Sequence, residues 1–373
     1  MAITGIRVAL LTLSALAVVL LQGLFNLNGG LEAMKKHAKE GVFSNGKTLH
    51  HVYLGYPVID DILSWSVSFW DPVCHESRST LLLSKTLSAS LQSLGVFAMI
   101  ESLRRQDKNI ILRWSPVNVF VWQYLGAAIF VPLYFVVELE SHLPQRKAAD
   151  PTVPYLQAKS LLPASTVTIL HLYRMVYFPP AGITTSQHQA WLAVWQLAPV
   201  FCYCALAALS TSLSRGDEKL NLQSQNADAR WIKATYSVFG AFSGVTHVAV
   251  MWLLASSKDT SVSLSAAFIP KIGSLWKSDT ANSVFINEYT FFLQWDYIII
   301  VIAGGIYATR IVDMIYYLRG CSLGLLSKVV VFIVAGTASH LFGCGLVWAA
   351  VLYAREDLLR LEYAKSLTKE TEE

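Results

Sequence analysis

The chain has 373 residues, of which 54% are hydrophobic and 14% charged, and its mean hydropathy is +0.45. A water-soluble domain of this size does not carry so much apolar surface, so the composition excludes a soluble globular enzyme and predicts burial in lipid. The formal charge of +4 is spread over loops instead of forming a basic stripe, which argues against a nucleic-acid partner.

Hydropathy predicts an all-α fold, a polytopic transmembrane helix bundle with about eight spans. The first apolar run follows Arg7 and is too long for the core of a secretory signal peptide, so we interpret it as a spanning helix. The segment 156–177 contains Pro163 and could span, kink or re-enter. The other predicted spans are 6–27, 81–101, 117–137, 190–213, 231–255, 291–312 and 325–353.

Two segments between these spans have unusual compositions. The segment 53–73 is apolar and aromatic but contains three aspartates, so we expect it at the membrane interface or folded into the bundle. The segment 256–290 mixes scattered charges with apolar patches and could cover the mouth of a cavity. The sequence predicts one transmembrane domain, 1–353, followed by a charged, solvated tail, 354–373.

Two clusters of cationic residues bear on the topology, since such clusters favour the cytoplasmic side of a membrane. With a full span at 156–177, the predicted helices would place the two clusters on opposite sides. The sequence therefore leaves the topology open. The first cluster is Arg104, Arg105, Lys108 and Arg113, and the second is Arg215, Lys219, Arg230 and Lys233.

Asp296 is the strongest candidate for chemistry, because ionisable groups at membrane depth are costly and mark functional sites. It lies near the start of a long apolar segment, next to Trp295 and Tyr297. Apolar surroundings favour the protonated form of a carboxyl group, since desolvation penalises its charge, and such a group can donate a proton. The alternative is that Asp296 lies at the interface and caps a helix or pairs with a loop cation.

A second group of candidates lies around a dense aromatic surface. Asp60, Asp61 and Asp71 flank Trp65 and Trp70, and an aromatic face stabilises a cation by about 0.5–2 kcal/mol. For Asp60 and Asp71, an interfacial aromatic belt with helix-capping aspartates is an equal alternative.

Two further polar residues have simpler explanations. Glu101 precedes Arg105 by four residues, so a surface ion pair accounts for it. His247 shares a helical face with Tyr236 and Ser243, which favours a structural interhelical hydrogen bond in the bundle interior. The sequence has no phosphate-binding glycine loop, no His-Glu-x-x-His site and no aspartate-rich Mg²⁺ motif, so we predict neither a metal nor another cofactor.

Several short motifs resemble those of one protein family. They are Tyr56-Pro-Val-Ile-Asp-Asp-Ile-Leu, Ser68-Phe-Trp-Asp-Pro-Val, Gln123-Tyr-Leu-Gly with Pro132-Leu-Tyr-Phe, and Phe292-Leu-Gln-Trp-Asp-Tyr. Together they resemble the fungal integral-membrane terpene cyclases of meroterpenoid pathways, of the ascofuranone, ascochlorin and macrophorin type, and related membrane proteins of indole-diterpene pathways.

The resemblance implies a cyclase that protonates a terminal epoxide or alkene of a prenylated aromatic or polyketide substrate and closes the chain without a metal. It implies a lipophilic substrate such as a prenylated phenol or epoxide, contact with membrane lipid, and a location in the endoplasmic reticulum. The residues of this sequence that we predict as catalytic acids for such chemistry are Asp296, with Asp61 or Asp71 as a second carboxylate, and then Glu101. The predicted substrate-binding residues are Trp65, Trp70, Gln123, His247, Trp252, Trp295 and Tyr297.

Two other functions remain open from the sequence. In a proton- or ion-coupled transporter, Asp296, Arg310 and His247 would form a relay across the membrane. In a non-catalytic membrane scaffold, the buried acids would only pack.

Overall fold

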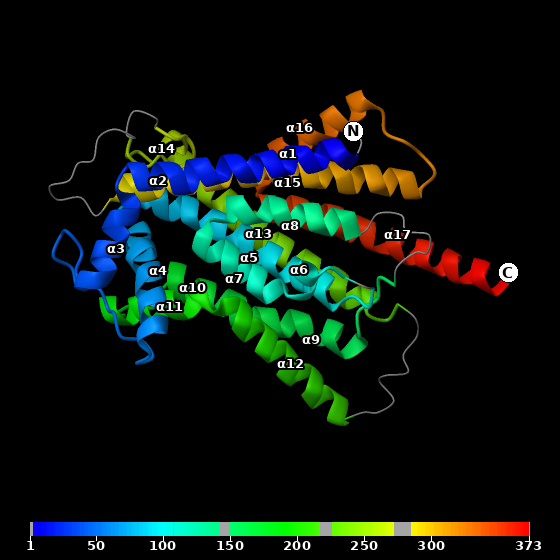
Figure 1. The fold of residues 1–373 in the computed structure, drawn as a ribbon, viewed down its shortest axis with the longest axis horizontal. Helices are drawn as coiled ribbons and strands as arrows, with labels where there is room; N and C mark the ends of the chain where they lie inside the picture. Colours follow the sequence, from blue (N-terminus) through cyan, green and yellow to red (C-terminus); the bar gives the residue numbers. More distant parts are fainter. Residues whose placement is uncertain (1–2, 107, 142–149, 217–225, 272–284, 373) are drawn as a thin grey trace.

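The computed structural model describes residues 3–106, 108–141, 150–216, 226–271 and 285–372, and in these residues the fold is built from helices joined by turns and loops (Figure 1). The described part contains no β-strand, which confirms the predicted all-α class. The helices are α1 Ile3–Ala17, η1 Val18–Gly23, α2 Leu24–Leu27, α3 Gly30–Glu40, α4 Pro57–His75, α5 Arg78–Leu103, α6 Ile110–Arg113, α7 Ser115–Leu125, α8 Ala127–Ser141, α9 Tyr155–Ser165, η2 Thr166–Leu170, α10 His171–Tyr177, α11 Thr185–Gln196, α12 Ala198–Gly216, α13 Ala229–Ser256, α14 Leu264–Phe268, α15 Ile286–Leu318, α16 Leu325–Phe342 and α17 Cys344–Glu372.

Five helical stretches among the described residues are long and apolar enough to cross a membrane, so the predicted count of eight is not confirmed. A sixth crossing arises if α11 and α12, which meet at a bend of 64°, act as one broken span. The five stretches are Thr4–Leu27, Arg78–Leu103, Ala229–Ser256, Ile286–Leu318 and Leu325–Phe342.

The predicted span 117–137 is a helical hairpin, not one helix. Gly126 breaks it with φ +103°, a backbone conformation that L side chains rarely adopt. The ring centroids of Trp122 and Tyr134 lie 5.9 Å apart, whereas a straight helix would separate these residues by about 18 Å along its axis. This segment therefore enters the bundle as α7 and returns as α8.

The hairpin removes the conflict between the two cationic clusters. Glu101 at the end of α5 and Glu138 at the end of α8 both bind Arg355, so α8 returns to the end of the bundle at which α5 finishes. Arg104 then binds Glu356, one turn from Arg360, which binds Asp228 at the start of α13. The beginning of α13 thus lies at the same end as the end of α5. Lys219 of the second cluster lies outside the described residues.

The other prolines and glycines also reshape predicted spans. The segment 156–177 is a continuous helical run that contains Pro163 and, three residues later, the π-helical turn η2. The predicted span 325–353 ends at Gly343, whose φ is +91°, and continues as the separate helix α17. A Cβ at Gly343 would lie 2.9 Å from the Cβ of His247.

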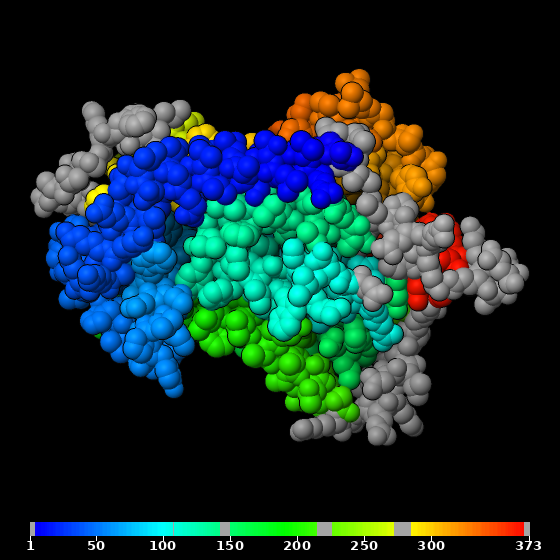
Figure 2. Space-filling model, in the orientation of Figure 1, coloured from blue at the N-terminus to red at the C-terminus, as the bar shows by residue number. Residues whose placement is uncertain are grey.

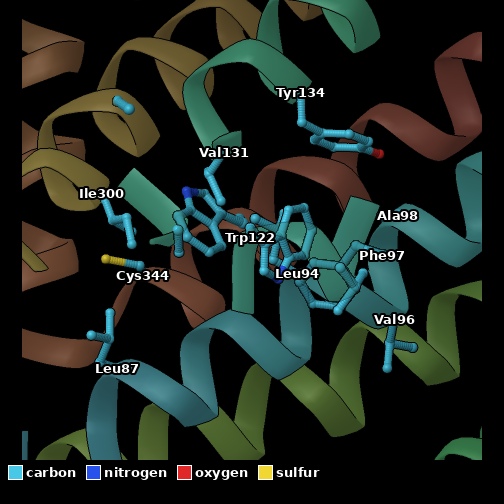
Figure 3. Close-up of a cluster of buried hydrophobic side chains, with 14 of the residues drawn as sticks. Leu87, Leu94, Val96, Phe97, Ala98, Trp122, Val131, Tyr134, Ile300 and Cys344 are labelled. Atoms are coloured by element: carbon cyan, nitrogen blue, oxygen red, sulfur yellow. The ribbon is translucent and has the colours of Figure 1, made fainter. Parts of the chain in front are cut away.

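The core of the bundle is an apolar cluster centred on α5, α13, α15 and α17. The long helix α13 packs along both α5 and α17. Gly240 and Gly244 of α13 permit this approach, since their Cα atoms face Ala349 and Leu346 of α17 closely. Figure 3 shows part of this cluster, with Leu87, Leu94 and Phe97 from α5, Trp122 from α7 and Ile300 from α15.

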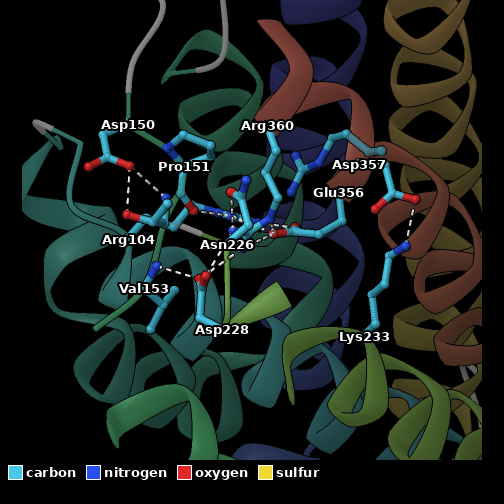
Figure 4. A network of polar contacts seen from close by, with 12 residues as sticks. Arg104, Asp150, Pro151, Val153, Asn226, Asp228, Lys233, Glu356, Asp357 and Arg360 are labelled. Atoms are coloured by element: carbon cyan, nitrogen blue, oxygen red, sulfur yellow. Dashed lines mark hydrogen bonds and ion pairs between the residues drawn. The ribbon is translucent and has the colours of Figure 1, made fainter. Parts of the chain in front are cut away.

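A network of buried ion pairs fills the end of the bundle near the C-terminus (Figure 4). Arg104 and Arg355 are 1% and 0% exposed, and Glu356 is 0% exposed. The Nε atom of Arg104 lies 2.8 Å from Oε2 of Glu101, and Nη2 of Arg355 lies 2.6 Å from Oε1 of Glu101. The expected surface pair between Glu101 and Arg105 is therefore wrong, because Glu101 is buried and binds other arginines.

The same network corrects the prediction of a solvated tail. α17 crosses residue 353 without a break, and its residues Arg355, Glu356 and Arg360 are buried. Their charges are paired within the protein, so their presence in the sequence is not a sign of solvation. The later residues Glu362 and Lys365 are more exposed. The division of the chain at residue 353 into a domain and a tail stays a prediction.

The aspartate-rich segment 53–73 is not a surface loop, because most of it forms α4. One face of α4 is buried and packs against α3, α5 and α11, so the segment folds into the bundle. Of the segment 256–290, residues 272–284 lie outside the described part. The described helix α14 buries Phe268 against Tyr297, with ring centroids 4.8 Å apart.

Candidate active site

An apolar cavity lies between the helices and extends along α5 to Met99, two residues before Glu101 of the ion-pair network. Its interior volume is about 210 Å³. On the face shown in Figure 2, a depression separates the blue residues of α3 and α4 from the green residues of α7 and α8. The wall is formed by residues of η1, α2, α3, α4, α5, α7, α8, η2, α11, α12 and α15. A cavity of this kind between helices is a typical site for a small apolar ligand.

Asp296 is the one carboxyl group among the described residues that line this cavity, and no lysine, arginine or histidine lines it there. The residue lies in the third turn of α15 and is 4% exposed. Its Oδ1 atom accepts a hydrogen bond from the backbone N–H of Ala128, at 2.6 Å. Among the described residues it makes no other hydrogen bond and no ion pair. The second carboxyl oxygen is therefore available to a ligand.

The bond to Ala128 explains how the backbone tolerates a break inside the membrane. Where the hairpin turns at Gly126, backbone groups lose their helical partners, and unpaired groups are costly in lipid. Asp296 binds a free N–H at the start of α8, Gln22 donates from Nε2 to the carbonyl oxygen of Leu125 at 2.8 Å, and Ser14 donates to that of Ile129 at 2.7 Å. The capping role considered for Asp296 is thus present, on a helix that begins inside the bundle.

The cavity wall is densely aromatic. Trp70 and Trp195 meet edge to face with ring centroids 5.0 Å apart, and Phe69 meets Phe292 in the same way at 5.5 Å. Each of these rings lines the cavity, so their negative faces are available to a positively charged carbon in the ligand. The aromatic lining residues are Phe25, Trp65, Phe69, Trp70, Trp122, Tyr124, Trp195 and Phe292.

The cavity includes some of the predicted substrate-binding residues and excludes others. Trp65, Trp70 and Gln123 line it, and Trp65, at 36% exposure, lies at its outer part. Trp252 points outward from α13 with 71% of its surface exposed, so it does not border the cavity. Trp295 and Tyr297, which flank Asp296 in sequence, are likewise absent from the lining.

His247 takes the structural role that the sequence favours. Its Nδ1 atom is hydrogen-bonded to Thr86, and its Nε2 atom lies 2.7 Å from the carbonyl oxygen of His340. These bonds join α13 to α5 and α16, and the predicted polar face with Tyr236 and Ser243 is buried, as expected. His247 does not line the cavity.

The other predicted acids lie outside the cavity. Asp61 is exposed on α4, and Glu101 belongs to the ion-pair network. Asp71 is 2% exposed, but its contacts are with His75 and Gln189 on the side of α4 away from the cavity lining. The side chain of Asp60 accepts hydrogen bonds from the backbone N–H groups of Leu54 and Tyr53. These bonds lower the pKa of Asp60, and the bond from Leu54 has the larger effect.

Five polar side chains of the cavity escaped the sequence analysis: Gln22, Ser66, Ser88, Gln92 and Tyr124. A glutamine inside an apolar span is costly in lipid, so the presence of Gln22 and Gln92 within predicted spans was a usable signal. The Oε1 atom of Gln92 is buried and has no hydrogen-bond partner among the described residues. Tyr124 and Trp195 carry no such signal, because aromatic residues are common at many depths of a membrane protein.

Comparisons with known proteins agree with the motifs. The chain is 27% identical over 315 residues to "Terpene cyclase DEP1" of Fusarium langsethiae, covering 81% of this chain and 85% of that protein. It is 25% identical over 317 residues to "Terpene cyclase ascI" of Acremonium egyptiacum, covering 82% and 79%. It is 24% identical over 299 residues to "Terpene cyclase DEP1" of Alternaria brassicicola, covering 77% and 80%. No solved structure matches the chain.

A family model gives the assignment. The model of the CtvD domain matches residues 6–360, which is nearly the whole chain and includes every residue of the cavity. Together with the three relatives, this match confirms the resemblance to the fungal membrane terpene cyclases of meroterpenoid pathways. The chain belongs to the CtvD-domain family.

Proposed function

We propose that this protein is a membrane-embedded terpene cyclase in which Asp296 starts the reaction by protonating its substrate. The substrate class is a prenylated aromatic or polyketide compound whose prenyl chain ends in an epoxide or an alkene. The names of three relatives support the cyclase activity. The observation that carries the mechanism is the position of one carboxyl group among the described residues that line a mainly apolar and aromatic cavity.

The proposed reaction is an isomerisation. Asp296 gives its proton to the epoxide oxygen, the C–O bond opens, and the more substituted carbon becomes electron-deficient. The π electrons of the neighbouring alkenes close the rings by forming C–C bonds, and the last cation loses a proton. One proton enters and one leaves, and no diphosphate departs, so the chemistry requires no Mg²⁺ to bind a leaving group.

The aromatic wall supports the later steps. Each ring face that meets the migrating positive charge lowers its energy by about 0.5–2 kcal/mol, more when water is excluded. Trp70, Trp195, Phe69 and Phe292 lie in edge-to-face pairs, which hold the rings in fixed orientations. The apolar wall also excludes water, which would otherwise trap the cation as an alcohol.

A lipophilic substrate of this kind dissolves in the bilayer, and five apolar helical stretches are compatible with insertion of the protein there. We place the enzyme in the endoplasmic reticulum, where a lipid-soluble intermediate would reach the cavity from the membrane past the partly exposed Trp65. Fractionation of cells that express a tagged chain tests this location.

The rival function of a proton- or ion-coupled transporter would use Asp296, Arg310 and His247 as a relay. Arg310 instead binds Asp313 at 2.7 Å, and His247 is held by Thr86 and His340. Neither Arg310 nor His247 lines the cavity that contains Asp296. The described geometry therefore gives the relay no support.

The substrate class is tested by feeding microsomes that contain the protein. A farnesylated phenol with a terminal epoxide is supplied without Mg²⁺, and a prenyl diphosphate is supplied in parallel with Mg²⁺. We expect cyclic product from the epoxide and none from the diphosphate, with membranes from cells that lack the protein as the control. Cyclisation of the diphosphate alone would contradict the proposal.

A further inference from the structure

A second cluster of reactive side chains lies outside the cavity, where the C-terminal end of α4 meets the first turns of α11. It consists of Asp71 and His75 of α4 and His188 of α11. One ligand atom from each of these side chains lies within 4.8 Å of the other two. Two imidazoles and one carboxylate at such distances are the donor set of many divalent transition-metal sites.

His188 already has the hydrogen bond that metal-bound histidines show. Its Nε2 atom lies 2.9 Å from the carbonyl oxygen of Val176. A carbonyl oxygen only accepts, so Nε2 carries the proton and Nδ1 has a free lone pair. Such a bond on the far side of the ring fixes the tautomer and orientation of a metal ligand. The Nδ1 atom of His75 faces the carboxylate of Asp71 and lies 2.8 Å from the backbone carbonyl oxygen of Asp71, a hydrogen bond that His75 would give up to bind an ion through this nitrogen.

The Nδ1 atom of His188 is a free ligand atom, and its burial without a hydrogen-bond partner costs stability. The residue is 2% exposed, and its Nδ1 atom is buried without a hydrogen-bond partner among the described residues. A buried polar atom without a partner costs about 1–3 kcal/mol. The ring of His188 meets that of His75 edge to face, with centroids 4.9 Å apart. A ligand between the two rings would satisfy this nitrogen.

Asp71 supplies the negative charge. The residue is 2% exposed, and among the described residues no lysine or arginine forms an ion pair with it. Its Oδ1 atom accepts from Nε2 of Gln189 at 3.3 Å and lies 3.4 Å from Nδ1 of His75. Both distances are long for strong bonds to a buried carboxylate, and His75 is the cationic partner of Asp71 only when its imidazole is protonated. A metal cation would compensate the charge of Asp71.

We propose that Asp71, His75 and His188 bind one divalent first-row transition-metal ion, of which Zn²⁺ is the most suitable probe. Zn²⁺ accepts two histidines and one carboxylate and completes a tetrahedron with a water molecule. His75 is the exposed member of the set, so the ion enters from the surface on its side. The hard ions Mg²⁺ and Ca²⁺ prefer sites built from oxygen atoms and are poor competitors here.

The ion would join α4 to α11 beside the wall of the cavity. Trp70 precedes Asp71 on α4, and Trp195 lies two turns after His188 on α11. These two tryptophans are the pair whose rings meet at 5.0 Å in the cavity wall. None of the three metal ligands lines the cavity, so the ion takes no part in protonation. Its effect is to hold the two helices together.

The test uses the full chain, purified in detergent and stripped of metal by a chelator that is then removed. Zn²⁺ binding is measured by calorimetry and by metal analysis after gel filtration, and Co²⁺ gives an absorption spectrum that reports histidine ligation. We expect one Zn²⁺ per chain and an increase in the thermal unfolding temperature. Fewer than about 0.2 equivalents of Zn²⁺, or no change of the Co²⁺ spectrum, would overturn the proposal.

Substitutions assign the site. Loss of a ligand should weaken Zn²⁺ binding at least about 10–100-fold, the range seen when even an outer partner of a ligand is removed. We expect this loss in His75→Ala and His188→Gln. His171→Ala is the matched control, because His171 is an exposed histidine on the neighbouring helix α10. His75 is exposed, so its substitution should not disturb folding even if that of His188 does. Equal Zn²⁺ affinity in His75→Ala and the wild type would overturn the assignment.

The outcome is independent of the proposed cyclase activity, because binding and unfolding are measured without substrate. The proposed metal site and the proposed cyclase mechanism also predict different effects of added metals on the cyclisation rate. A rate that falls on removal of metal and returns with Zn²⁺ supports the helix clamp. A rate that returns only with Mg²⁺ would contradict the proposed mechanism at the cavity.

Discussion

Asp296 combines two roles at the scale of a single residue, and the structure allows them to be separated. One oxygen of its carboxyl group binds the backbone N–H of Ala128, while the residue also lines the apolar cavity. An asparagine in its place has the same shape and keeps an oxygen that accepts the backbone bond, but it cannot donate a carboxylic proton. An alanine loses both functions.

The structural role predicts a difference in stability between two substitutions. Loss of a side-chain cap costs about 0.5–2 kcal/mol, so Asp296→Ala should have a lower free energy of unfolding than Asp296→Asn by about this amount. Thermal or denaturant unfolding of both variants in the same detergent measures the difference. Equal stability of the two variants would show that the bond to Ala128 does not support the hairpin.

The sequence identified Asp296 because a carboxyl group is rare in an apolar span. It identified Trp70 and Gln123 in the motifs that resemble the cyclases, and Trp65 among the aspartates of the aromatic segment 53–73. It could not separate Asp296 from Asp61 and Asp71, since an acid near tryptophans looks the same in sequence whether it faces the cavity, the surface or another helix. The structure separates them by the orientation of α4, which buries Asp71 beside α11 and exposes Asp61.

At the scale of elements, the hairpin of α7 and α8 determines the form of the cavity. Its turn at Gly126 lines the cavity and brings the start of α8 to Asp296. Hydropathy cannot detect such a turn, because the two short helices together have the length and composition of one span. The φ of +103° at Gly126 depends on a glycine, but a glycine inside an apolar segment is too common to predict a turn.

The hairpin predicts a strong effect of one small substitution. In Gly126→Ala, the new Cβ would lie 2.8 Å from Cδ2 of Leu21 and the backbone would remain in a strained conformation. Strain of this kind costs about 1–3 kcal/mol, so we expect lower thermal stability and lower cyclase activity.

The control for this substitution is Gly336→Ala. A Cβ at Gly336, in the helix α16, would meet no atom within 4 Å, and its φ is not positive. Alanine also favours a helix more than glycine does, so stability should be unchanged or slightly higher. Equal losses of stability in both variants would contradict the account of the hairpin.

At the scale of the whole molecule, the two ends of the bundle are built from different groups of residues. One end is held by buried ion pairs around Arg355 and Glu356 of α17, the Asp71 cluster lies toward the other end, and the cavity lies between the helices. Sequence reasoning gave the fold class, yet it interpreted the C-terminal charges as a solvated tail. Alternating charges look alike whether they face water or pair with residues distant in sequence, such as Glu101 and Glu138.

The ion-pair network predicts a loss of stability without a specific loss of chemistry. Arg355→Met leaves Glu101 and Glu138 without this partner, and removal of one partner of a buried pair costs about 3–5 kcal/mol. Lys365→Met removes an exposed cation from the same helix and should change stability by less than about 0.5 kcal/mol. Thermal unfolding of the two purified variants measures both effects, and similar unfolding temperatures would show that the network contributes little.

The measurement that tests the central claim most directly is the rate of cyclic product formation by Asp296→Asn. It is compared with the wild type and with Asp61→Asn, which makes the same chemical change at an exposed position of α4, in microsomes with equal amounts of protein. General acid catalysis contributes about 10²–10⁴-fold, so the account predicts a loss of that size for Asp296→Asn and a rate within about twofold of the wild type for Asp61→Asn. Undiminished product from Asp296→Asn would contradict the assignment of Asp296 as the proton donor.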